Sequence, residues 1–363
     1  MPRRKSPTVY DVAEHAGVSI ATVSRVLRSP EKVTVSTRER VLAAVQDLRY
    51  VPNASARGLA GRRTGVLGLL IPGHDISTAS RRPVDASGTI EFLDDHHDSH
   101  GGPFRNRYFE QLVHGAEAAT WDAGYGLLIA AGSSVSRDMV VRDLTGRVDG
   151  LAVIARTLPD ELITRAADSV PLVLVAGRLP GTTDSVSVDN RGGMSALTEY
   201  VLRVKPPGPT LYLAGSVDSP DAVERELGFR DALAAHPGPW HTAAADFSWQ
   251  GGHEAALEQL RSGPPGAVIG ANDQSALGAL AALRVAGVRV PEECVVTGFD
   301  GIDESRYSHP PLTTVRQPMA DLGIHAVEAL LSRIADPGAE PRDLRLAVDV
   351  LLRQSSELSA PTD

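Results

Sequence analysis

The segment VSIATVSRVL, residues 18–27, places three hydroxyl groups and one guanidinium group among branched apolar side chains. If this segment is a helix, Val23, Val26 and Leu27 can face a core. Its other side and its N-terminal end then carry residues that can touch base edges in the major groove of DNA, namely Ile20, Ala21, Thr22, Ser24 and Arg25. A bidentate contact to guanine suits Arg25, and an apolar contact to a thymine methyl group suits Ile20 or Ala21. The alternative is a small helical domain with solvated Ser and Thr side chains.

Three short helices are predicted to hold this segment. Thr8, followed three residues later by Asp11, predicts the start of a first helix, and Gly17 predicts its end because glycine readily adopts a positive φ. Ser19 can cap the second helix. A third helix is predicted to begin at a cap formed by Ser36 and Glu39 and to carry an apolar stripe at Val41, Leu42, Val45 and Leu48. This order predicts a helix-turn-helix DNA-binding head.

The charge distribution supports a polyanion-binding head. The chain has a net charge of −9, but residues 1–63 hold 12 basic and five acidic residues, a net charge of +7, which leaves −16 on the other 300 residues. A basic head on an acidic body is typical of a nucleic-acid-binding module attached to a domain with another role. An incidental basic surface is the alternative on charge alone.

Length and composition indicate a soluble protein with more than one domain. The chain has 363 residues, of which 42% are hydrophobic, enough to bury sizeable cores. Its longest apolar runs are far below the roughly 18 residues that a membrane helix needs, so we expect a cytoplasmic, nucleoid-associated protein without a membrane partner. The single cysteine, Cys294, is predicted to be a buried structural thiol.

Residues 50–65, YVPNASARGLAGRRTG, are predicted to connect the head to the body. Pro52 ends the third helix and Asn53 can cap a short helix, which on its own should be mostly unfolded. Leu59 stands between Arg57 and Arg62, an arrangement suited to a wedge inserted into the minor groove. An ordinary flexible linker is the alternative.

The segments TVYDVAEHAGVSIATVSRVL and VPNASARGLAGRRTGVLGLLIP resemble the lactose-repressor/galactose-repressor (LacI/GalR) family of bacterial transcription regulators. The resemblance implies a hinge helix that folds on DNA and a leucine wedge at the centre of a pseudo-palindromic operator, a role that falls to Leu59. Gly58 departs from the better helix formers usual in the family, so hinge folding is expected to depend strongly on DNA. The DNA-binding residues predicted in total are Thr8, Ser19, Ile20, Ala21, Thr22, Ser24, Arg25, Asn53, Ala56 and Leu59.

From residue 65 onward, short β-rich runs alternate with amphipathic stretches, which predicts parallel α/β sheets. The predicted strands cover residues 65–71, 126–130, 150–154, 172–175, 210–214, 267–269 and 295–297. The predicted helices cover residues 108–122, 192–204, 222–235, 252–261, 275–286 and 319–334. About 300 residues exceed one doubly wound sheet, so two are expected, with a ligand cleft at the carboxyl ends of their strands.

Blocks such as VSVDNRGG, VVTGFDGID and PPLTTVRQPMADLG extend the resemblance across the body, whose fold is expected to resemble periplasmic sugar-binding proteins. The resemblance assigns effector contacts to Arg225, Phe247, Asn272 and Asp300. Purely structural roles are the alternatives: an ion pair on a helix surface for Arg225, a core position for Phe247, and a helix cap for Asn272. The position of Asp221, also counted as an effector residue, often holds serine or threonine in the family, so the pattern for a simple hexose is incomplete.

The chain departs most from the family at about residues 73–105, an insertion between the first strand and the following helix. It contains neighbouring Asp and His side chains at 94–100. Adjacent residues of an extended chain point in different directions and rarely share one metal ion, so a solvated polar loop is preferred over a metal site, a lid or a partner-binding element. No metal site or cofactor is predicted.

The sequence therefore predicts a helix-turn-helix head at residues 1–51, a hinge at 52–63 and an effector-binding and dimerisation domain at 64–363. The predicted protein is a homodimeric repressor that binds a double-stranded DNA operator and is controlled by a small, sugar-like effector. It lacks the GxxxxGK[ST], GxSxG and HExxH motifs and is not expected to be an enzyme. The alternative is an effector-independent regulator with a degenerate cleft.

Overall fold

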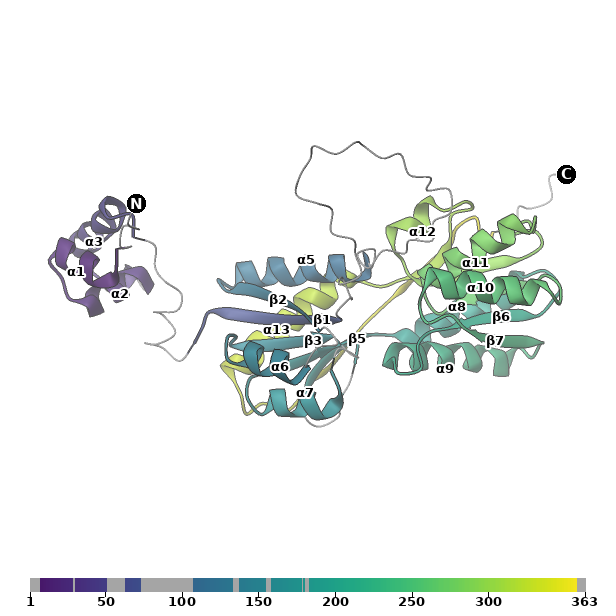
Figure 1. Cartoon of the computed structure of the whole chain (residues 1–363), viewed down its shortest axis with the longest axis horizontal. Coiled ribbons are helices and arrows are strands. Elements are labelled where there is room, and N and C mark those ends of the chain that lie inside the picture. Colours follow the sequence, from purple (N-terminus) through teal and green to yellow (C-terminus); the bar gives the residue numbers. More distant parts are fainter. Residues whose placement is uncertain are drawn as a thin grey trace, which may run out of the picture. The chain divides into compact units, whose positions relative to one another are not determined.

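The computed structural model of the chain describes residues 7–28, 30–50, 63–72, 107–132, 137–154, 158–177, 179 and 183–357. Two compact units result, Met1–Gly65 and Val66–Asp363 (Figure 1). Three predicted DNA-binding positions, Asn53, Ala56 and Leu59, lie outside the described residues, as do nearly all of the hinge and the insertion at 73–105.

The first unit contains α1 (Val9–Ala16), α2 (Ile20–Arg28), the short 3-10 helix η1 (Pro30–Lys32) and α3 (Val35–Asp47). The predicted capping box is present: the Asp11 amide donates to Thr8 Oγ1, and the Thr8 amide donates to Asp11 Oδ2 at 2.6 Å. Gly17 ends α1 with a φ of 62°, and Ser19 Oγ accepts a hydrogen bond from the Thr22 amide. Local capping chemistry thus sets both ends of α1 and the start of α2.

The predicted cap of the third helix is wrong by two residues. Thr34 is the N-cap of α3, and its hydroxyl bonds the hydroxyl of Thr37 and not a backbone amide. Of the predicted apolar stripe, Val41 is buried and Val45 and Leu48 pack against the head core, but Leu42 is 44% exposed. Ala44, which was not predicted, is buried. Helices α1 and α3 contact each other around the head core, which contains Val12, Ala13, Ala16, Val23, Val26, Val41, Ala44 and Tyr50.

The second unit contains the two predicted parallel sheets. The first has the strand order β11-β5-β4-β3-β1-β2 and is built from β1 (Val66–Pro72), β2 (Gly126–Gly132), β3 (Gly150–Ile154), β4 (Leu172–Val175), β5 (Asp184–Val188) and β11 (Asp343–Leu346). The second has the order β12-β10-β9-β8-β6-β7 and is built from β6 (Thr210–Ala214), β7 (Trp240–Ala244), β8 (Ala267–Gly270), β9 (Val295–Asp300), β10 (Thr313–Arg316) and β12 (Asp349–Leu351). Only β12 runs antiparallel to its neighbour in the described sheets, and it pairs with β10.

Helices cover both faces of each sheet. The first subdomain contains α5 (Arg107–Asp122), α6 (Arg137–Thr145), α7 (Asp160–Ala167) and α13 (Met319–Ala335); the second contains α8 (Asn190–Val204), α9 (Pro220–Ala235), α10 (Trp249–Leu260), α11 (Asp273–Val285) and the short α12 (Asp303–Tyr307). Alternate strand residues enter opposite cores, as the two-residue period of a strand requires. Ala152 and Ile154 pack with α5 and α13, whereas Leu151 and Val153 pack with α6 and α7.

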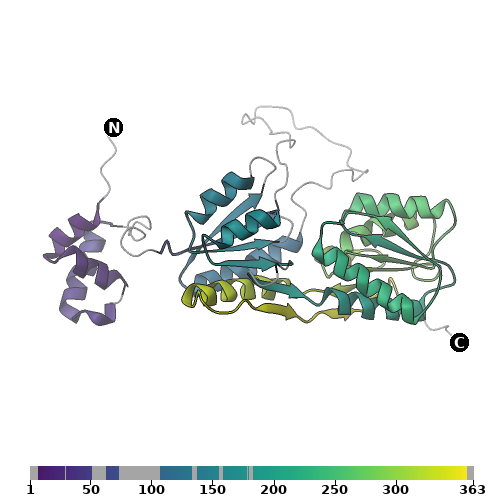
Figure 2. The same ribbon diagram turned by 90° about the horizontal axis from the view of Figure 1, so that it is seen from below.

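The chain crosses between the two subdomains three times. It leaves the first subdomain after β5, at Asp189, and returns after β10, at Gln317. The third crossing joins β11 to β12, and Figure 2 shows it as yellow strands that run from one subdomain to the other. These crossings bring polar residues from distant parts of the sequence to the junction of the two subdomains.

Candidate functional site

Helix α2 has the two faces that its sequence predicts. Val23 and Val26 are buried, and Leu27 packs against the same core. The remaining side chains are exposed or half-buried; they are Ser19, Ile20, Ala21, Thr22, Ser24 and Arg25. The first turn of α2 contains no acidic residue, so nothing in that turn opposes a phosphate backbone. Thr8 is exposed as well, but its hydroxyl already donates to Asp11 Oδ2 at 2.8 Å.

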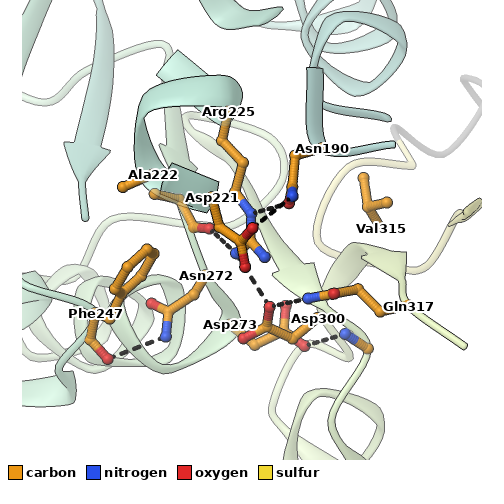
Figure 3. A network of polar contacts seen from close by, with 12 residues as sticks. Asn190, Asp221, Ala222, Arg225, Phe247, Asn272, Asp273, Asp300, Val315 and Gln317 are labelled. Carbon is orange, nitrogen blue, oxygen red and sulfur yellow. Dashed lines mark hydrogen bonds and ion pairs between the residues drawn. The ribbon is translucent and has the colours of Figure 1, made fainter. Parts of the chain in front are cut away.

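In the body, the structure brings all five predicted effector residues together (Figure 3). They follow the carboxyl ends of four adjacent strands of the second sheet: Asp221 and Arg225 on α9 after β6, Phe247 after β7, Asn272 after β8 and Asp300 at the end of β9. Ligands of parallel α/β folds bind at this edge of the sheet. The cluster is therefore a consequence of topology as well as of residue type.

Arg225 is the centre of the cluster and is only 2% exposed. Its Nε donates to Asn190 Oδ1 at 2.8 Å, and its Nη1 donates to the carbonyl oxygen of Ala271 at 2.7 Å and to Asp300 Oδ1 at 3.1 Å. The guanidinium carbon lies 3.9 Å from the ring centroid of Phe299, which adds a cation–π contact. These contacts contradict the alternative of an ion pair on a helix surface.

Two residues of this network, Asn190 and Gln317, were missed by the sequence analysis. Asn190 is the first residue of α8 after the first crossing, and its Nδ2 donates to Asp221 Oδ1 at 2.8 Å. Gln317 lies at the second crossing, and its Nε2 donates to Asp300 Oδ1 at 2.7 Å. Each is a polar residue that follows closely on a strand, and this signal could have identified both.

Asn272 has the helix-cap role that had been left open. Its Oδ1 caps α11 by accepting from the Ser275 amide at 3.0 Å and from the Ser275 hydroxyl at 2.7 Å. Its Nδ2 donates to the carbonyl oxygen of Phe247 at 3.0 Å. Asn272 therefore positions the loop that carries Phe247.

Phe247 is half-buried and adopts a φ of 56°, an unusual conformation for a bulky residue. Its ring lies directly over Gly215, where an added Cβ would come within 2.3 Å of the ring. The ring centroid is 5.7 Å from the guanidinium carbon of Arg225. The strained backbone and the glycine floor hold the aromatic ring at the edge of the polar network.

Burial is the main cause of the raised pKa values of three carboxyl groups, those of Asp221, Asp273 and Asp300. It raises the pKa of Asp221, against the opposing influence of Arg225 and Asn190. It raises the pKa of Asp300 to about 6, again against the Arg225 charge. Burial and the nearby Asp300 charge raise the pKa of Asp273 to about 8, although Thr314 and the amides of Gly301 and Ile302 donate to it. Two of these carboxyl groups, Asp221 and Asp300, thus lie beside the one guanidinium group of Arg225.

A cavity of about 200 Å³ adjoins Asp300. Its wall combines α5 and the start of α13 with the loop after β9, and it is lined by Glu110, Gln111, His114, Asp300, Gly301, Ile302, Asp303 and Met319. Among the described residues, no group of three or more His, Cys, Asp or Glu side chains could hold a metal ion.

A helix-turn-helix head joined to a two-subdomain α/β body defines a DNA-binding regulator with a periplasmic-binding-protein-like domain. Residues 8–53 match the model of bacterial regulatory proteins of the lacI family, and residues 210–356 match the periplasmic binding protein-like domain. The chain is 30% identical to the HTH-type transcriptional regulator CelR of Thermobifida fusca, over 98% of this chain and 100% of CelR. It is 31% identical to the HTH-type transcriptional repressor PurR of Photobacterium profundum, over 96% of this chain and 98% of PurR. The chain belongs to the LacI family.

Solved structures of two regulators show the same fold. The complex of CelR with cellobiose is 28% identical, with a TM-score of 0.67 over 96% of this chain and 99% of that one. The dimer of the lac repressor bound to operator and the anti-inducer ONPF is 27% identical, with a TM-score of 0.78 over 97% of this chain and 99% of that one. In the described part of the protein, every helix is too short or too polar to cross a membrane.

Proposed function

We propose that this LacI-family protein is a cytoplasmic repressor that binds a pseudo-palindromic DNA operator as a homodimer and responds to a small, sugar-like effector. The observation that carries the effector role is the convergence of Asp221, Arg225, Phe247 and Asp300 at the junction of the two α/β subdomains. A half-buried aromatic ring beside fixed polar groups suits a ligand with one apolar face and several hydroxyl groups. CelR and the lac repressor, both similar to this chain, have been solved with cellobiose and with ONPF respectively.

The crossings offer a route from the effector to DNA. Asn190 and Gln317 lie where the chain passes between the subdomains, and each is hydrogen-bonded to a predicted effector residue. A ligand that binds one relative position of the subdomains better than another shifts their equilibrium. In the proposal this shift changes the spacing of the two hinges and thereby the docking of the two α2 helices in the major groove.

The proposal includes no enzymatic role. Arg225 and Asp300 hold each other in an ion pair with 3.1 Å between Nη1 and Oδ1, and both side chains are buried. Catalysis by acid and base would instead need groups free to exchange protons with a substrate.

Thermal melting of the purified protein tests the effector role. The compounds are mono- and disaccharides, amino sugars, sugar phosphates, nucleosides and divalent metals, and binding to the native state raises the melting temperature with concentration. One class of compound should raise it, and the same compound should change the affinity for operator DNA. If no compound has both effects, the alternative hypothesis of an effector-independent regulator is correct. That rival draws support from the network itself, since Arg225 and Asn272 already have partners within the chain.

A further inference from the structure

The polar network offers hydrogen-bond acceptors that no described residue uses. Asp300 Oδ1 accepts from both Arg225 and Gln317, and Asp221 Oδ1 accepts from Asn190. In the described part of the chain, the second oxygen of each of these two carboxyl groups accepts no hydrogen bond. Asp221 is half-buried and Asp300 is buried, so the Asp221 carboxyl group is the more accessible of the two. A ligand that contacts these oxygens must donate hydrogen bonds to them.

Gln317 provides a third acceptor. Its side chain is held against the Asp300 carboxylate through Nε2, which leaves its Oε1 buried without a partner among the described residues. Gln317 is 3% exposed. A buried amide oxygen without a partner is costly in free energy unless a water molecule or a ligand donates to it.

The cavity beside Asp300 also presents acidic side chains. Of the side chains that line it, Glu110 and Asp303 are exposed acids, and neither has an ion-pair partner in the described ranges. The lining includes no described Lys or Arg. Beside one guanidinium, Arg225, the network and the cavity therefore present the carboxyl groups of Asp221, Asp300, Glu110 and Asp303.

From these contacts we infer that the effector is a polyhydroxylated amine, an amino sugar in chemical class, whose ammonium group lies between the network and the acid-lined cavity. This inference rests on the proposed effector function and narrows its ligand. An ammonium group donates three hydrogen bonds and supplies the positive charge that balances the excess carboxylates. A phosphate or carboxylate group at the same place would lie beside Asp300, which shares the cavity with Glu110 and Asp303, so sugar phosphates and sugar acids are excluded from this half of the cleft.

The experiment compares matched ligands on the full-length protein at neutral pH. Isothermal titration uses pentoses, hexoses and disaccharides, each beside its amino counterpart and, for the hexoses, its 6-phosphate. The expected result is that one amino sugar binds at least about tenfold more tightly than its neutral counterpart, the size of a charged hydrogen bond, while the phosphate does not bind. The preference should weaken at high salt, because Glu110 and Asp303 are exposed.

Single substitutions locate the amine. Glu110→Gln and Asp303→Asn should each lower the affinity for the amino sugar several-fold and leave the affinity for the neutral sugar unchanged. Glu258→Gln, on the exposed side of α10 and paired with Arg261, is the matched control and should change neither affinity. Asp303 and Glu110 are exposed, so thermal melting should show that both variants fold.

Each outcome decides a different point. Equal or tighter binding of the neutral sugar, or tight binding of a phosphate, overturns the amino-sugar inference and leaves the effector function standing. Unchanged amine preference in both cavity variants overturns the role of the cavity. If no compound in any series binds, both the effector function and this ligand class are wrong.

Discussion

The Nε of Arg225 donates a 2.8 Å hydrogen bond to Oδ1 of Asn190, and so ties helix α9 to the first crossing between the subdomains. The other end of the Asn190 amide donates to Asp221. One side chain therefore orients two predicted effector residues that are four positions apart on α9.

Asn190→Ala should destabilise the protein and weaken effector binding. It leaves a buried Arg225 donor without a partner, which costs about 1–3 kcal/mol of unfolding free energy. The adjacent variant Arg191→Ala is the control, because it removes only an exposed ion pair with Asp231 and should change stability little. Chemical denaturation measures both. Equal losses in the two variants would contradict a special role for the Asn190 amide.

The pH dependence of stability should reveal Asp300. Its pKa is raised to about 6 in the folded protein, above the value of about 3.9 for an unfolded chain, so the folded state binds the proton more tightly. The stabilisation from this group is fully present below about pH 4 and is lost as pH rises through about 6. In Asp300→Asn the loss between pH 4 and 7 should become smaller than in the wild type. Melting curves across this range, with Asp231→Asn as an exposed control, test the difference; parallel curves would contradict it.

The sequence predicted seven of the twelve described strands and most of the longer helices, but it did not predict β5, β7, β10, β11, β12, α6, α7 or α12. Several of these omissions have physical causes. Strand β5, DSVSV, mixes polar and apolar residues although four of its five residues are buried, so it lacks the apolar run of a buried parallel strand. The edge strand β7 has exposed residues. Strand β7 and helix α12 each have only five residues, too few for a hydrophobic period to be recognised in one sequence.

The candidate site was predictable only in part. Arg225, Phe247 and Asp300 were named from family resemblance, because nothing in their local spacing brings residues 225 and 300 together. Asn190 and Gln317 were missed because their importance depends on the crossings, a property of the tertiary fold. In the head, by contrast, the caps at Thr8 and Gly17 are local, and the sequence alone located them.

Thr8→Ala should loosen the start of α1. It removes the hydroxyl of the capping box and should cost about 1 kcal/mol. Thr34→Ala is the matched control, since Thr34 caps α3 without a side-chain hydrogen bond to the backbone. Hydrogen exchange of the amides of α1 in the full-length protein should accelerate several-fold in the first variant and stay unchanged in the second. Unchanged exchange in Thr8→Ala would show that the capping box contributes nothing.

Arg25→Ala should weaken binding to the preferred operator by about 1–3 kcal/mol and relax the preference at one base pair in each half-site. Arg25 is exposed on α2, where a guanidinium can reach guanine. The control is Arg40→Ala on the exposed side of α3. Phosphate contacts carry no sequence information, so this variant should leave the base preference unchanged. Selection of operators from random DNA measures both effects. A uniform loss in Arg25→Ala would mean that Arg25 contacts only the DNA backbone.

Leu59→Ala should reduce the bending of operator DNA while the head stays folded. The residue lies outside the described part of the chain, and its wedge role follows from the flanking arginines and from family resemblance. Insertion of an apolar side chain between base pairs unstacks them and kinks the duplex, so its removal should leave the DNA straighter and the affinity lower. Energy transfer between dyes at the two operator ends reports the bend angle. Leu42→Ala, which removes an exposed leucine from α3, should leave that angle unchanged, and an unchanged angle in Leu59→Ala would refute the wedge.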